Sequence, residues 1–182
     1  MMVYFILYAR EGIYFLSGDT YGGSVFPMQI LMPTLFFIGL TNIMGIQVMV
    51  PLGKEKWVLY SVTLGAIVDM LINAVLIPGM ASSGAAIGTL IAEAAVLVYQ
   101  YWKLKDLTCG ILEKVHWKIL IFAVLIAGAV AIWVKVLNLG VFFTLVLSAV
   151  IYFGIYGAIL LVTGEPLLKE IWGQMLKKIQ MK

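Results

Sequence analysis

Long apolar stretches dominate this sequence, and their length is what most constrains its fold. An α-helix needs about 20 apolar residues to cross the hydrocarbon core of a bilayer, where every backbone polar group must be satisfied within its own segment. Five stretches meet that length: residues 26–52, 57–78, 84–102, 117–137 and 141–163. With 63% hydrophobic and 12% charged residues, the chain has more apolar surface than a soluble domain of this size can bury. We therefore expect an all-α membrane protein.

A sixth apolar run occupies residues 1–17 and carries Arg10 and Glu11 in its middle. An isolated lipid-facing helix tolerates such charges poorly, so we interpret this run as a crossing that is truncated at its start. It lacks the basic region and cleavage site of a signal peptide. No Pro- or Ser-rich linker divides the chain. We expect residues 1–163 to form one polytopic bundle of about six transmembrane helices.

The C-terminal segment, residues 164–182, has a different pattern. Apolar side chains recur there at helical spacing and lysines occupy the other face; the apolar positions are Leu167, Leu168, Ile171, Trp172, Met175, Leu176 and Ile179. The pattern predicts an amphipathic helix on the inner membrane surface. A partly disordered cytoplasmic tail is the alternative, because the segment is short.

Lysine and arginine residues predict the orientation, since short loops that carry them tend to remain cytoplasmic. Ten of the twelve basic residues fall in alternate connections, at residues 53–56, 103–118 and 164–182. The exceptions are Arg10 and Lys135. We expect a multi-pass protein of the cytoplasmic (inner) membrane with both termini in the cytoplasm.

Polar residues at membrane depth are expensive and are functional candidates by default. Asp69 and Asn73 lie four residues apart on one helix face, and Glu93 lies midway along the stretch 84–102. They are candidates for an ion or substrate pathway. The alternatives are interhelical hydrogen bonding for Asp69 and Asn73 and a protonated or paired carboxyl for Glu93.

Three further pathway candidates lie nearer the N-terminus. Asn42 and Gln47 share the stretch 26–52 with Pro33, which favours a kink with polar groups turned inward. The guanidinium group of Arg10 could bind a phosphate through two parallel hydrogen bonds. Alternatively, Glu11 simply neutralises the positive charge of Arg10.

Other chemistries find little support in the sequence. The chain has one cysteine, Cys109, and one histidine, His116, which leaves no Cys/His metal set and no oriented nucleophile–base pair. We expect no cofactor, no metal and no nucleic-acid partner. Residues 79–84 (GMASSG) are typical of a tight turn rather than a phosphate loop. Gly84, Gly88 and Ala92 at four-residue spacing predict close helix packing.

Several strings resemble a known family. They are residues 36–42 (FFIGLTN), 51–56 (PLGKEK), 65–68 (GAIV) with Asn73, 77–78 (IP), and 84–89 (GAAIGT) with Ala92 and Glu93. Together, across residues 26–102, they resemble the polysaccharide biosynthesis C-terminal domain of the multidrug, oligosaccharidyl-lipid and polysaccharide exporter superfamily. Over residues 103–182 only hydropathy supports the likeness.

The resemblance implies a flippase that moves lipid-linked oligosaccharides across the membrane by alternating access, in two lobes of which this chain would supply the second. Its partners would be membrane lipids, the lipid-linked sugar, and an N-terminal lobe or a second copy of itself. Asp69 departs from the family pattern, which usually has an amide there. The alternatives are a drug or cation antiporter of the same superfamily, a membrane-embedded enzyme, and a non-transporting truncated fragment. We expect no enzymatic activity, because no acid, base and nucleophile converge.

Overall fold

The computed structural model describes residues 1–112, 117–137 and 139–163, with side chains omitted for 106–112 and 117. The described residues are helical with no strand, which confirms the all-α expectation. The chain divides into two compact units, Met1–Val115 and His116–Lys182. The first contains α1 (Met2–Leu7), α2 (Ala9–Ser17), the 3-10 helix η1 (Asp19–Ser24), α3 (Val25–Leu31), α4 (Thr34–Asn42), the π-helix η2 (Ile43–Met49) and α5 (Glu55–Leu112); the second contains α6 (Trp117–Val136) and α7 (Val141–Val162).

In the described part of the chain, four helical segments are long and apolar enough to cross a membrane, which supports the membrane class; the predicted number of about six is not confirmed. They are Asp19–Met49, Glu55–Lys105, Lys118–Val136 and Val141–Val162. The first apolar run is not among them; it forms two short helices, α1 and α2, which meet at Tyr8. The predicted amphipathic helix at 164–182 lies outside the described residues.

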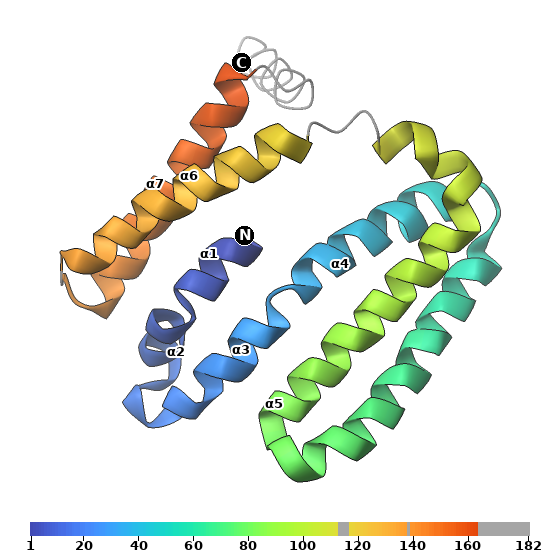
Figure 1. Ribbon diagram of the computed structural model, residues 1–182, viewed down its shortest axis with the longest axis horizontal. Coiled ribbons are helices and arrows are strands. Elements are labelled where there is room, and N and C mark those ends of the chain that lie inside the picture. The colour runs from blue at the N-terminus through green and yellow to red at the C-terminus, as the bar shows by residue number, and fades with distance from the viewer. Residues whose placement is uncertain (113–116, 138, 164–182) are drawn as a thin grey trace, which may run out of the picture. The chain divides into compact units, whose positions relative to one another are not determined.

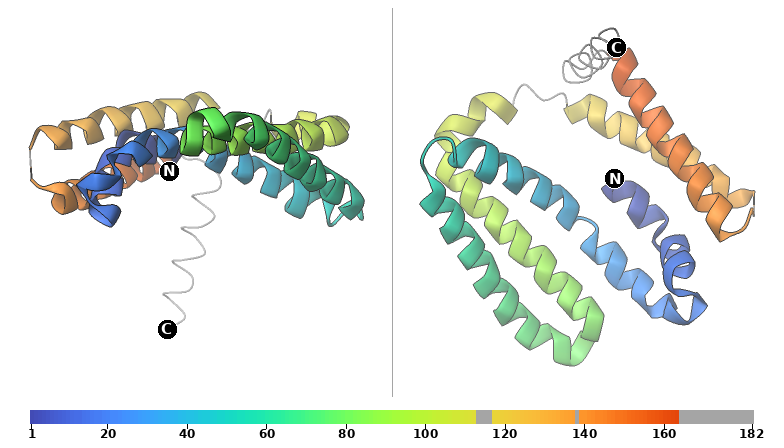
Figure 2. Two further views of the ribbon diagram at one scale, coloured as in Figure 1. Left: turned by 90° about the horizontal axis from the view of Figure 1, so that it is seen from below. Right: turned by 180° about the vertical axis from the view of Figure 1, so that it is seen from behind.

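α5 is a hairpin rather than one long rod. Its regular geometry is interrupted at Ala81, with φ 47° and ψ −124°, and the chain reverses there (Figure 1). We call residues 55–80 the first arm and residues 82–112 the second arm. Figure 2 shows the two arms side by side from behind as well. The turn predicted at residues 79–84 is confirmed, and α5 covers two of the predicted stretches.

Small residues bring the two arms together. A Cβ atom added to Gly84 would lie 2.6 Å from the carbonyl oxygen of Leu76, and one added to Gly88 would overlap Oδ1 of Asn73. Gly65 leaves similar room for Val96. The glycine and alanine spacing at 84, 88 and 92 therefore marks a close helix contact, as predicted.

The stretch 26–52 is interrupted, as its Pro33 predicts. α3 ends at Leu31 and α4 begins at Thr34, and the Thr34 hydroxyl donates to the Leu31 carbonyl at 2.5 Å. The helix then widens into the π-helix η2, a form that is rare and frequent at functional sites. α3, α4 and η2 all pack against α5.

The second unit is a helix pair, α6 against α7. Ala123, Ala127 and Ala131 of α6 are fully buried at four-residue spacing, and Ser148 and Tyr152 of α7 are buried too. This stripe lets two apolar helices approach closely without a hydrophobic driving force between them. The sequence pattern does not single out this alanine stripe, because alanine is common throughout the chain.

Candidate functional site

The first unit contains a cavity of about 470 Å³ between α4, η2 and both arms of α5. Its polar lining combines two carboxylates, two amides and two hydroxyls: Asp69, Glu93, Asn42, Gln100, Thr41 and Thr89. The remaining lining side chains are mostly small or aliphatic, and none is basic. Two carboxylates from different arms of one hairpin thus share a single cavity.

The cavity lies at mid-membrane depth if the aromatic residues of α5 mark the interface. Asp69 is twelve residues after Trp57, about 18 Å along the helix axis, and Glu93 is nine residues before Trp102, about 13 Å. The hydrocarbon core is roughly 30 Å thick. Both carboxyl groups therefore fall near its middle.

Two polar oxygens of this cavity are buried without a donor. Within the described part of the chain, neither Asp69 Oδ1 nor Gln100 Oε1 has a hydrogen-bond partner. Leaving such an atom unsatisfied costs about 1–3 kcal/mol. A buried polar oxygen without a protein partner is a candidate contact for a bound ion or ligand.

Gln100 ties the two arms to the π-helix. Its Nε2 donates to Ser61 Oγ of the first arm at 2.9 Å, and both side chains are buried. Ser61 in turn donates to the Val58 carbonyl at 2.7 Å. On the other side, a Cβ atom added to Gly45 of η2 would lie 3.2 Å from Gln100 Nε2. Gly45 thus allows the π-helix to pack directly on this amide.

Asn73 faces the hairpin contact rather than the main cavity. It packs against Gly88, and its Oδ1 also has no partner among the described residues. With Asp69 it borders a second hollow of the first arm near Pro78. Asp69 therefore lines both the main cavity and this second hollow, whereas Asn73 lines only the second hollow.

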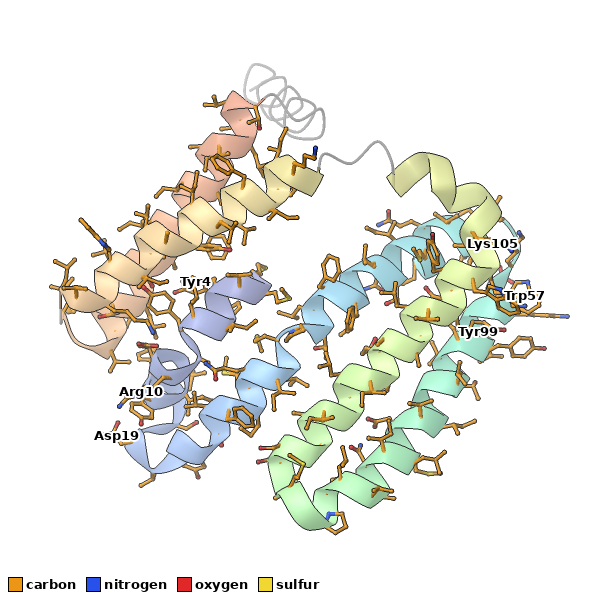
Figure 3. The ribbon with its side chains drawn as sticks, viewed as in Figure 1. Tyr4, Arg10, Asp19, Trp57, Tyr99 and Lys105 are labelled. Carbon is orange, nitrogen blue, oxygen red and sulfur yellow. The ribbon has the colours of Figure 1, made fainter. Side chains whose placement is uncertain are left out.

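The structure separates the remaining candidates from the cavity. Gln47 is exposed on η2 and does not line it. Arg10 is exposed on α2, with its Cζ 5.1 Å from the centre of the Tyr14 ring (Figure 3). The cavity thus gathers Asp69, Glu93 and Asn42 from the predicted set.

Gln100 is the residue that the sequence interpretation missed. It lies near the end of the predicted stretch 84–102, beside Tyr101 and Trp102, so its amide does not stand out as a polar group at membrane depth. The available signal was its spacing, because Gln100 follows Glu93 by seven residues and so lies on the same helix face. Thr89, four residues before Glu93, shares that face.

The hydroxyls of the cavity are held by their own helices. Thr41 Oγ1 donates to the Ile38 carbonyl and Thr89 Oγ1 to the Ala85 carbonyl, each at 3.1 Å. In the described residues, no group of three or more His, Cys, Asp or Glu side chains is placed to hold a metal ion. The side chains of Cys109 and His116 lie outside the described part.

Comparisons with known proteins add nothing to this geometry: no family model, no curated protein and no solved structure matches the chain. The function is therefore argued from the cavity and its surroundings.

Proposed function

We propose that the chain is one helical bundle of a flippase that moves lipid-linked oligosaccharides across the cytoplasmic membrane by alternating access. The observation that carries this proposal is the polar cavity at mid-membrane depth. Carboxylates, amides and hydroxyls can all exchange hydrogen bonds with sugar hydroxyls. The cavity volume of about 470 Å³ is within the range of roughly 300–1,000 Å³ that ligand sites occupy.

The strings that resemble the polysaccharide biosynthesis domain surround this cavity. The strings 36–42, 65–68 and 84–89 each contribute lining residues, and Glu93 follows the last of them. The resemblance and the geometry thus point to the same part of the chain. This coincidence supports the transport proposal.

Broken helices border the same site. The interruption at Pro33 and the π-helix η2 precede and flank the cavity. Substrate sites of transporters are typically formed by discontinuous helices near the midplane, where the irregular backbone is tolerated because it lines a cavity. We infer that α4 and η2 are the segments that move during access.

A second bundle has to complete the pathway. Alternating access requires one bundle to rock against another around a site between them. The cavity described here has no basic side chain for the pyrophosphate of a lipid-linked sugar. We propose that an N-terminal lobe or a second copy of this chain supplies those basic groups.

A drug or cation antiporter is the second candidate, and the unpaired carboxylate oxygen favours it. Asp69 and Glu93 together with Gln100 Oε1 present oxygen atoms to a cavity that holds no positive side chain. A cationic substrate or a coupling ion would satisfy them. Neither candidate requires a covalent step, and both cavity hydroxyls donate to carbonyl groups of their own helices.

Binding of a fluorescent lipid-linked oligosaccharide to the purified chain in nanodiscs tests the proposal. We expect saturable binding that free oligosaccharide competes away and that the double variant Asp69→Asn with Glu93→Gln weakens. Gln47→Glu, an exposed change outside the cavity, is the matched control and should bind as the wild type does. Binding of a lipophilic cation but not of the sugar would favour the antiporter, and binding of neither would refute both.

A further inference from the structure

A third recess, distinct from the polar cavity and from the hollow near Pro78, lies on the opposite face of the α5 hairpin. Its lining is apolar. It is an apolar groove of about 480 Å³. Its lining is Leu64 of the first arm and Ile91, Ala94, Ala95, Val98, Tyr99 and Trp102 of the second arm. We call it the outer groove.

Helix geometry separates the outer groove from the polar cavity. Successive residues turn by about 100°, so Val98 lies about 140° around the second arm from Glu93 and about 160° from Gln100. Val98 is 66% exposed. The outer groove therefore faces the surroundings of the hairpin, outside any pathway through the polar cavity.

The length of the outer groove matches one membrane leaflet. Ile91 and Trp102 are eleven residues apart, about 16 Å along the helix, and half of a hydrocarbon core of roughly 30 Å is about 15 Å. The groove thus runs from the aromatic residues at the interface to the membrane midplane. Its floor contains Ala94 and Ala95, whose small side chains leave room for one acyl chain.

A positive charge stands at the interfacial end of the outer groove. Lys103 Nζ lies 4.2 Å from the centre of the Trp102 ring and 4.1 Å from that of Trp57 on the first arm, with Tyr99 at 5.7 Å. Figure 3 places Trp57 and Tyr99 at this end of the hairpin. Such contacts fix an ammonium group by cation–π attraction. Among the described residues, no carboxylate pairs with Lys103.

We propose that the outer groove binds one anionic phospholipid of the membrane, with an acyl chain along Ala94 and Ala95 and its phosphate at Lys103. Charge complementarity selects this occupant, because an ammonium group held between two indole rings suits a phosphate. Basic residues at this level are attracted to anionic leaflets. Lys103 lies in the connection that the sequence places on the cytoplasmic side, so the lipid belongs to the inner leaflet. The choice of leaflet rests on the predicted orientation, whereas lipid binding requires only that the chain lies in a membrane and is independent of the transport proposal.

Native mass spectrometry of the purified full chain tests the headgroup part of this proposal. The chain is titrated with phosphatidylglycerol and with phosphatidylcholine of identical acyl chains. We expect one phosphatidylglycerol to be retained about fivefold more tightly, the value that corresponds to about 1 kcal/mol for one basic residue near an anionic surface. Lys103→Gln should bring the preference close to one. Lys105→Gln is the matched control and should keep it, because Lys105 is exposed and about 200° around the helix.

A second pair of variants tests the groove itself. Val98→Trp places a bulky ring in the outer groove and should reduce retention of both lipids, without disturbing packing because Val98 is largely exposed. Val75→Trp makes the same change at a 75% exposed position of the first arm outside the groove and should have no effect. Equal retention of both headgroups by the wild type, an equal loss in Lys105→Gln, or unchanged retention in Val98→Trp would each overturn the proposal.

Discussion

The close contact at the bend of α5 makes Gly84 the most sensitive small residue of the hairpin. A Cβ atom on Gly84 would lie 2.6 Å from the Leu76 carbonyl oxygen and 2.7 Å from its carbonyl carbon. Ordinary van der Waals contact begins at about 3.4 Å, so Gly84→Ala has to separate the arms locally by about 0.8 Å. The neighbour is backbone and cannot rotate away as a side chain can.

Overpacking of this kind typically costs about 1–3 kcal/mol. We expect Gly84→Ala to lower the free energy of unfolding by an amount in that range. Gly79→Ala is the matched control, because Gly79 lies in the same hairpin and a Cβ atom there meets nothing within 4 Å. It should leave stability unchanged or slightly raised, since alanine is the better helix former.

Equilibrium unfolding of the purified chain in mixed micelles, followed by circular dichroism, measures both variants against the wild type. The two glycines are five residues apart and differ in what surrounds them rather than in composition. Equal free energies of unfolding for Gly84→Ala and Gly79→Ala would refute the argument that backbone contact at the bend fixes the two arms.

Four further predictions concern the pathway and the topology. Asp69→Asn should insert normally, and Asp69→Leu should raise thermal stability by removing an unsatisfied oxygen, while both reduce transport in a two-lobed assembly; unaffected transport in both would favour a purely structural role for Asp69. Gln100→Leu should cost less than about 1 kcal/mol in thermal or chemical unfolding, because a membrane-buried hydrogen bond contributes about 0.6 kcal/mol on average; a much larger loss would contradict this. Ser82→Cys in a Cys109→Ser background should react with an impermeant thiol reagent from outside the cell, and reaction only from the cytoplasm would reverse the predicted orientation. The purified chain alone in liposomes should not flip a fluorescent lipid-linked sugar, and protein-dependent flipping without another subunit would show that copies of this chain rebuild the whole pathway.

The two carboxylates of the cavity show how much of the candidate site can be located from the sequence alone. Charged groups in apolar runs have to turn away from lipid, so Asp69 and Glu93 could be singled out without a structure. Helix periodicity also places Gln100 on the face of Glu93. The sequence cannot say that Asp69 of one arm meets Glu93 of the other, because that depends on how the two arms are rotated about their axes.

The amino-acid sequence by itself determined that this protein belongs in a membrane, that it is helical, and where its helices are interrupted. The features responsible act locally, through backbone hydrogen bonding and sterics, so they can be read along the chain. They are the lengths of the apolar stretches, Pro33 and the glycine-containing segment 79–84. The tertiary structure decided which polar groups share the cavity and which do not. Close contacts at Gly84 and Gly88 set the rotation of the arms, which places Asn73 at the hairpin contact, and the packing of α4 and η2 on α5 leaves Gln47 outside. Such contacts join residues far apart in the chain, and no local pattern specifies them.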